Sequence, residues 1–215
     1  ITSTGFYSAP ASISSTQIVT VKAASQADSS NFGTATVTLN PPPVSSPSAI
    51  NVFGTGVAAA GVLAADGAAD SHYTLVSSVD PGFPGPGAFV VNSNVFPIGP
   101  WLTNGPNSKW IAPQANEGLG NLSGDYTYRT TFNLTGFNAA TAVITGRAAA
   151  DNSVTIKLNG VTIGSATSFT AFTSFSASSG FLAGVNTLDF VVNNAVYSSA
   201  NPTGLRVDVS GTVSP

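Results

Sequence analysis

Residues Tyr126–Leu134, with the sequence YTYRTTFNL, decide the fold class of this chain. Tyrosine, phenylalanine and leucine occupy even-numbered positions of this stretch, whereas Thr127, Arg129 and Thr131 occupy odd-numbered ones. A period of two is typical of a β-strand with one face in the core and the other toward solvent. We therefore predict a half-buried strand here, with the aromatic rings inward.

The same alternation recurs later in the chain, in Val154–Leu158, Leu188–Val192 and Leu205–Val209. Asn159-Gly160 follows the first of these runs and precedes another alternating piece, which predicts a two-residue hairpin turn with positive φ at both positions. Alanine-rich stretches are short and interrupted by glycine, so no helix is expected. Evenly spaced strands with long connections favour a jelly-roll β-sandwich over residues 50–215.

The first forty residues predict a second, smaller β structure. Thr16–Ala23 and Gly33–Leu39 alternate as strands, and only a turn-like piece, Ile1–Pro10, precedes them. An immunoglobulin-like sandwich needs about seven strands. We therefore expect residues 1–40 to be an incomplete Ig-like β segment that a neighbouring subunit completes. Further Ig-like strands encoded before Ile1 would explain the same shortage.

Residues 41–49 are predicted to link the two parts. Three consecutive prolines begin this segment and a fourth follows at Pro47. Such a segment favours an extended polyproline helix, which acts as a semi-rigid spacer.

The unfinished sheet leads to the main functional hypothesis, a secreted structural protein that forms an extracellular filament from copies of itself. Pairing with strands of another copy would satisfy open backbone groups at the sheet edge. A head-to-tail contact that does not close produces a helix rather than a ring. The side chains expected to be buried between copies are Ile18, Val19, Val21, Val37 and Leu39.

Composition excludes several classes of function. Charged residues are 7 % of the chain, where about 25 % is usual, and the six basic residues form no cluster, which argues against nucleic-acid binding. A surface of Thr, Ser and Asn favours an extracellular or cell-surface location. The chain has no Cys, which excludes a thiol nucleophile. Apolar runs are far shorter than the about 20 residues of a membrane helix, so no membrane span is expected.

Two tryptophans suggest an alternative function, a carbohydrate-binding module. Trp101 and Trp110 lie in a region rich in Pro and Gly, where indole rings could stack on sugars. Packing in the core is the commoner use of such rings and stays open as the other interpretation.

Acidic residues and the single histidine give weaker indications of chemistry. Asp66 and Asp70 could offer oxygen ligands to a structural calcium ion, the one cofactor considered, although EF-hand spacing is absent. His72 lies two residues from Asp70, which is compatible with catalysis or with a structural hydrogen bond. Glu117 and Asp125 could form a glycosidase pair, or be solvated loop residues. No convincing nucleophile, base or metal cluster emerges, so we do not expect an enzyme.

Two sequences fit the N-glycosylation pattern. They begin at Asn121 and at Asn133, and Asn133 lies on the outward face of its predicted strand. The Ser- and Thr-rich faces and the linker could equally carry O-linked glycans.

Two parts of the chain resemble known families. Residues 1–39, notably Ser3–Ala11 and Val19–Ser25, resemble the C-terminal half of bacterial Ig-like repeats, without the Trp-bearing strand that normally precedes it. Residues 66–213 resemble jelly-roll domains of secreted, PEP-CTERM-type bacterial proteins and, more loosely, galactose-binding-like domains. The motifs that carry this second resemblance are Asp70–Leu75, Ser108–Ile111, Gly124–Arg129, Asp151-Asn152, Leu158–Gly160, Gly184–Asn194 and Pro202–Val207. In architecture, the whole chain is similar to subunits of extracellular filaments held together by strand exchange.

Overall fold

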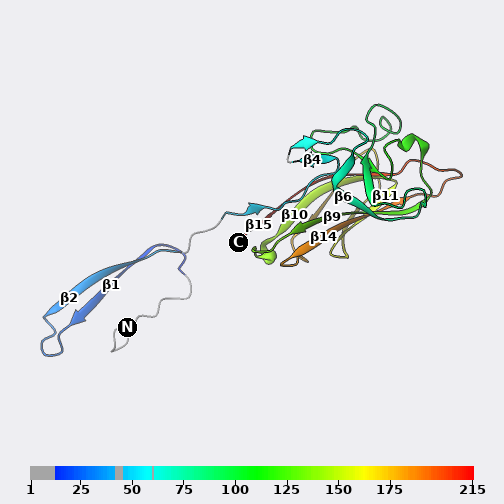
Figure 1. Cartoon of the computed structure of the whole chain (residues 1–215). Helices are drawn as coiled ribbons and strands as arrows, with labels where there is room; N and C mark the ends of the chain where they lie inside the picture. Colours follow the sequence, from blue (N-terminus) through cyan, green and yellow to red (C-terminus); the bar gives the residue numbers. More distant parts are fainter. Residues whose placement is uncertain (1–12, 42–45, 60) are drawn as a thin grey trace. The chain divides into compact units, whose positions relative to one another are not determined.

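The computed structural model describes residues 13–41, 46–59 and 61–215, and the chain divides into two units, Ile1–Ser45 and Ser46–Pro215 (Figure 1). The division falls inside the segment expected to be a linker. The turn-like piece Ile1–Pro10 and residues 42–45 of that linker lie outside the described residues.

The first unit contains one antiparallel hairpin, made of β1 (Gln17–Ala24) and β2 (Phe32–Leu39). Both strands were predicted to within one residue of their ends. Directly paired residues share a face, so the register places Val19 opposite Val37 and Val21 opposite Ala35 on one apolar face.

The opposite face of this hairpin carries mostly threonines, with Lys22 lying 3.8 Å from the ring centroid of Phe32. Ile18 lies on this threonine face, unlike the other four side chains expected to be buried between copies. No side chain of either strand is buried within the described part of the chain.

The second unit is formed almost entirely by strands. They are β3 (Ser48–Ala49), β4 (Val57–Ala59), β5 (Val62–Leu63), β6 (Ala69–Ser78), β7 (Gly87–Val90), β8 (Ile111–Ala112), β9 (Gly124–Asn133), β10 (Val143–Asp151), β11 (Ser153–Leu158), β12 (Val161–Ala166), β13 (Thr173–Ala177), β14 (Val185–Asn194) and β15 (Gly204–Val213). The helical segments of the described residues are two short 3-10 turns, η1 (Glu117–Leu119) and η2 (Ala139–Thr141). Within these residues no helix is long and apolar enough to cross a membrane.

Eleven of these strands belong to one sheet, in the order β12-β11-β14-β9-β6-β7-β8-β15-β10-β13, with β3 added beside β15. The two ends of this order come together, because a Cβ atom at Gly164 of β12 would lie 3.0 Å from the Cβ of Phe175 on β13. The sheet therefore folds over itself as a β-sandwich, which confirms the all-β prediction.

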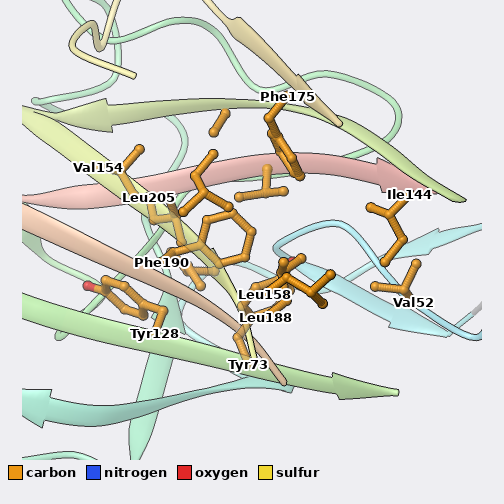
Figure 2. Close-up of a cluster of buried hydrophobic side chains, with 14 of the residues drawn as sticks. Val52, Tyr73, Tyr128, Ile144, Val154, Leu158, Phe175, Leu188, Phe190 and Leu205 are labelled. Atoms are coloured by element: carbon orange, nitrogen blue, oxygen red, sulfur yellow. The ribbon is translucent and has the colours of Figure 1, made fainter. Parts of the chain in front are cut away.

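The core lies between the two halves of this folded sheet (Figure 2). Phe190 of β14 contacts Phe175 of β13 with 6.1 Å between ring centroids, and Tyr73 of β6 with 6.0 Å. Tyr126 and Tyr128 of β9 are fully buried, as their alternation predicted. The hairpin turn between β11 and β12 is also confirmed, with φ of 50° at Asn159 and 84° at Gly160.

Candidate ligand-binding groove

A groove of about 560 Å³ lies on the second unit, against the outward face of β10, β13 and β15. The register of these neighbouring strands aligns polar side chains in rows: Arg147 of β10 is paired with Ser174 on one side and with Asp208 on the other. In the next row, Thr145 is paired with Ser210. The floor of the groove is therefore polar.

The remaining lining comes mainly from the segment before β4, which runs beside β15, and from the β4–β5 hairpin. Its members include Val57, Leu63 and the half-buried ring of Phe53. The Phe53 ring stacks on His72 with 3.8 Å between centroids and 10° between planes, which fixes its orientation. Apolar and aromatic side chains together with a few polar groups are the usual lining of small-ligand sites.

Two arginines lie close to one carboxylate of this floor, Asp208, and Arg147 contacts it directly. Arg147 Nε donates to Asp208 Oδ2 at 2.8 Å, and Nη2 lies 2.6 Å from the same oxygen as an ion pair. Asp208 Oδ1 accepts from the Ser108 hydroxyl, which in turn accepts from Arg206 Nε at 2.9 Å. Arg206 also donates from Nη1 to the carbonyl oxygen of Thr103.

The ring of Phe172 contacts both guanidinium groups. Its centroid lies 4.4 Å from Cζ of Arg147 and 4.9 Å from Cζ of Arg206, distances at which a cation is attracted to the ring. Arg206 is buried, and burial lowers its pKa while the nearby Asp208 opposes that change. An arginine guanidinium stays protonated in proteins, so Arg206 keeps its charge despite this burial.

Both tryptophans lie in the core and not at the groove. Trp101 is 2 % exposed and Trp110 is fully buried, with their rings 4.4 Å apart. The Nε1 atom of Trp101 donates to Asp151 Oδ2 at 2.8 Å, and that of Trp110 donates to the Leu102 carbonyl at 2.7 Å. Neither ring has a face open to a sugar, so the core interpretation of these residues is the one that the structure favours.

The two aspartates considered for calcium are occupied by separate partners. Asp66 accepts from Lys109 Nζ at 2.8 Å and from the backbone and hydroxyl of Ser93, each at 2.8 Å. Asp70 accepts from the backbone N–H groups of Gly56, His72 and Tyr73. In the described ranges no three acidic, His or Cys side chains gather as metal ligands. Asp70 thus holds the backbone of His72 and makes no hydrogen bond to its ring.

The two candidate glycosylation sites differ in accessibility. Asn121 is buried, and its Nδ2 donates to Asp80 Oδ2 at 3.0 Å, so this amide has no room for a glycan. The folded structure therefore does not favour a glycan at Asn121. Asn133 is exposed at the end of β9, where its Oδ1 accepts from the backbone and hydroxyl of Thr135. Glycosylation at Asn133 stays a prediction.

Glu117 is not the solvated loop residue that the sequence suggested. Its side chain is completely buried, Oε2 accepts from the backbone of Thr203 at 3.0 Å, and Oε1 has no partner. Burial raises the pKa of Glu117 to about 8, and the carboxylates of Asp151 and Asp80 add to this effect. Asp125 is exposed, so the two residues do not face a common ligand as a glycosidase pair would.

No protein-family model matches this chain, and no curated protein matches it. Several solved structures overlap part of it, among them three with sequence identities of 16–20 %. One is the FMN-binding β-glucuronidase from Facaelibacterium prausnitzii L2-6, with a TM-score of 0.34 and 20 % identity over 44 % of this chain and 17 % of that one. Another is the CBM36-1 domain of a multidomain xylanase from the hindgut metagenome of Trinervitermes trinervoides, with a TM-score of 0.27 and 16 % identity over 41 % of this chain and 71 % of that one. The third is the PA14 sugar-binding domain from an RTX adhesin, with a TM-score of 0.24 and 19 % identity over 40 % of this chain and 46 % of that one.

These overlaps involve less than half of this chain, and the chain spans less than two thirds of the glucuronidase and of the adhesin domain. At such TM-scores they say nothing about which residues of this chain bind a ligand. The resemblance to Ig-like repeats and to PEP-CTERM-type proteins stays a prediction.

Proposed function

We propose that the Ser46–Pro215 unit is a carbohydrate-binding module whose ligand lies in the groove over β10 and β15. The observation that carries this proposal is the polar floor, with Thr145 and Ser210 in one row and Ser174 beside Arg147 in the next, in the same groove as the ring of Phe53. The groove volume falls within the 300–1,000 Å³ typical of ligand sites.

The chemistry of the floor suits a ligand with many hydroxyl groups. Each serine or threonine hydroxyl donates one hydrogen bond and accepts others, which matches the dual character of sugar hydroxyls. The Phe53 ring, which lines the same groove, offers an apolar surface to the C–H groups of a sugar. Both oxygens of Asp208 are already engaged by Arg147 and Ser108, which supports binding without catalysis. Together with the low content of charged residues, this function favours a location outside the cell.

A glycan array followed by isothermal titration calorimetry of the full chain tests this proposal. Thr145→Val and Ser210→Ala each remove one hydroxyl from the floor, and we expect each to weaken binding roughly twofold to tenfold, the range for one hydrogen bond. Thr131→Val, on an exposed position of β9 outside the groove, is the matched control and should leave affinity unchanged. Absence of binding to any glycan by the parent protein overturns the proposal.

The hairpin of the first unit supports a second candidate function, self-association. Its apolar face, which includes Val19, Val21 and Val37, has no covering layer in the described part of the chain. A two-stranded hairpin is marginally stable by itself in water. Packing of this face against a different apolar surface of the next copy, with pairing at the open edges, would stabilise the hairpin, and this head-to-tail contact, repeated without closing, would build a filament.

Size-exclusion chromatography with light scattering and negative-stain microscopy test self-association. Val19→Lys combined with Val37→Lys places two charges on the apolar face, and we expect it to abolish the assemblies. The control pair is Thr20→Lys with Thr36→Lys, which are also opposite each other but lie on the threonine face. A parent protein that is monomeric at every concentration, or equal effects of the two pairs, would contradict this function.

A further inference from the structure

We infer that the groove selects an acidic sugar, a uronic acid in the simplest case, and that Arg147 binds its anionic group. This inference rests on the proposed carbohydrate-binding function and adds the class of ligand.

The first reason is the balance of charge around the groove floor. Arg147 and Asp208 are the charged side chains that line the groove, and the buried Arg206, which is not part of the lining, lies on the same Phe172 ring as Arg147. Arg206 therefore adds a second positive charge close to the one carboxylate of the lining. Arg206 donates to the neutral oxygens of Ser108 and Thr103, so its charge is not cancelled by a carboxylate in direct contact.

The second reason is the orientation of Arg147. Its Nε donates to Asp208 Oδ2, its Nη2 forms an ion pair with the same oxygen, and its side chain is 50 % exposed. Within the described part of the chain, its Nη1 atom makes no hydrogen bond, so the Nη1–Nη2 edge is available to a ligand. That edge of a guanidinium can donate two parallel hydrogen bonds to a carboxylate.

The third reason is that Arg147 is held in place before any ligand binds. Asp208 fixes one edge of the guanidinium and Phe172 lies against its face. Ligand binding therefore costs little conformational entropy for ordering this side chain. Asp208 itself is shielded from a bound anion, because the Ser108 hydroxyl and Arg147 donate to its two oxygens.

The test compares two oligosaccharides that differ only at C6, an oligogalacturonate and the corresponding neutral galactan oligomer, by calorimetry with the full chain. We expect the uronate to bind about tenfold to a hundredfold more tightly at low salt, as for a charge-assisted hydrogen-bonded pair. The preference should shrink as salt is added, because the groove is partly exposed.

Variants separate Arg147 from the charge of the whole protein. Arg147→Gln should bring the ratio of the Kd values for the neutral and acidic oligosaccharides close to one. Arg147→Lys keeps the positive charge but cannot make the bidentate contact, so it should give an intermediate ratio. Lys157→Gln, on β11 outside the groove, changes the net charge by the same amount and should leave the ratio unchanged. Thermal melts confirm that each variant is folded.

The outcomes distinguish the two levels of the proposal. If both oligosaccharides bind equally, if the neutral one binds better, or if Arg147→Gln keeps the preference, the acidic-sugar inference is wrong while carbohydrate binding stands. If no glycan of either kind binds, carbohydrate binding fails and the inference fails with it.

Discussion

Replacing Glu117 with glutamine should remove most of the pH dependence of stability between pH 6 and 8. The Glu117 carboxyl is completely buried, and its Oε2 accepts one hydrogen bond from the backbone of Thr203. Burial favours the neutral form and raises its pKa from 4.5 to about 8. The folded protein therefore holds a proton on Glu117 that the unfolded chain releases.

The sign and size of the effect follow from proton linkage. Stability from this group is fully present below pH 4.5 and is lost as pH rises toward 8, by about 1.4 kcal/mol per pH unit. The total approaches about 5 kcal/mol, comparable to the lower limit of the usual 5–15 kcal/mol for a domain. Burial also raises the pKa of Asp151, to about 6, so its contribution has the same sign but is largely complete by pH 6.

Urea unfolding at pH 6, 7 and 8, followed by the fluorescence of the buried tryptophans, measures this slope. The parent protein should lose free energy of unfolding by roughly 1.4 kcal/mol per pH unit. Glu117→Gln should be nearly flat, since its amide keeps an oxygen for the Thr203 N–H and does not titrate. Asp125→Asn, at an exposed carboxyl, is the control and should keep the parent slope.

The reasoning is refuted by either of two results. One is a parent protein whose free energy of unfolding does not change between pH 6 and 8. The other is a Glu117→Gln variant that keeps the parent slope, which would assign the titration to another group.

Two further substitutions test the packing of the second unit. Trp101→Phe removes the N–H that Asp151 accepts and should lower the free energy of unfolding by about 2–3 kcal/mol, measured by urea denaturation; an unchanged value would mean that this hydrogen bond contributes nothing. Gly146→Ala places a Cβ 2.6 Å from the ring of Phe175 and should lower Tm, at a cost of about 1–3 kcal/mol, whereas Gly184→Ala, with open space around it, should not; equal Tm values would contradict the close approach.

The local pattern of the sequence was sufficient to predict most strands of the second unit. In β9 the even positions are buried as expected, because strand geometry alone sets which side chains share a face. The turn at Asn159-Gly160 was also predictable from local sequence, because few residue pairs accept positive φ at both positions.

The groove could not be predicted, because its network joins residues that are far apart in the chain. Ser108 and Asp208 are separated by 100 positions, and Ser108 and Arg206 by 98. They meet because β15 lies between β8 and β10 in the sheet, an order that periodicity does not encode. The alternation in Leu205–Val209 did indicate that Arg206 and Asp208 share a face, which was the one local signal of this site.

Two other residues show where local composition misleads. The Pro- and Gly-rich surroundings of Trp101 suggested an exposed loop, but the fold brings this segment over Asp151 and Trp110 as a second small core. Glu117 lies among polar neighbours in sequence, and its burial depends on the distant backbone of Thr203. In both cases the environment of the residue is set by tertiary contacts.

The pairing of β3 with β15 has a mechanical consequence. Ser48 is paired with Val213, Ala49 with Thr212, and the backbone N–H of Ile50 bonds to the carbonyl of Gly211. Because these strands are antiparallel, a pulling force applied before Ser48 and after Val213 acts at one end of the ladder. The hydrogen bonds would then break one after another instead of sharing the load. Under tension the second unit should therefore open from this corner at low force, and yield as a compliant element.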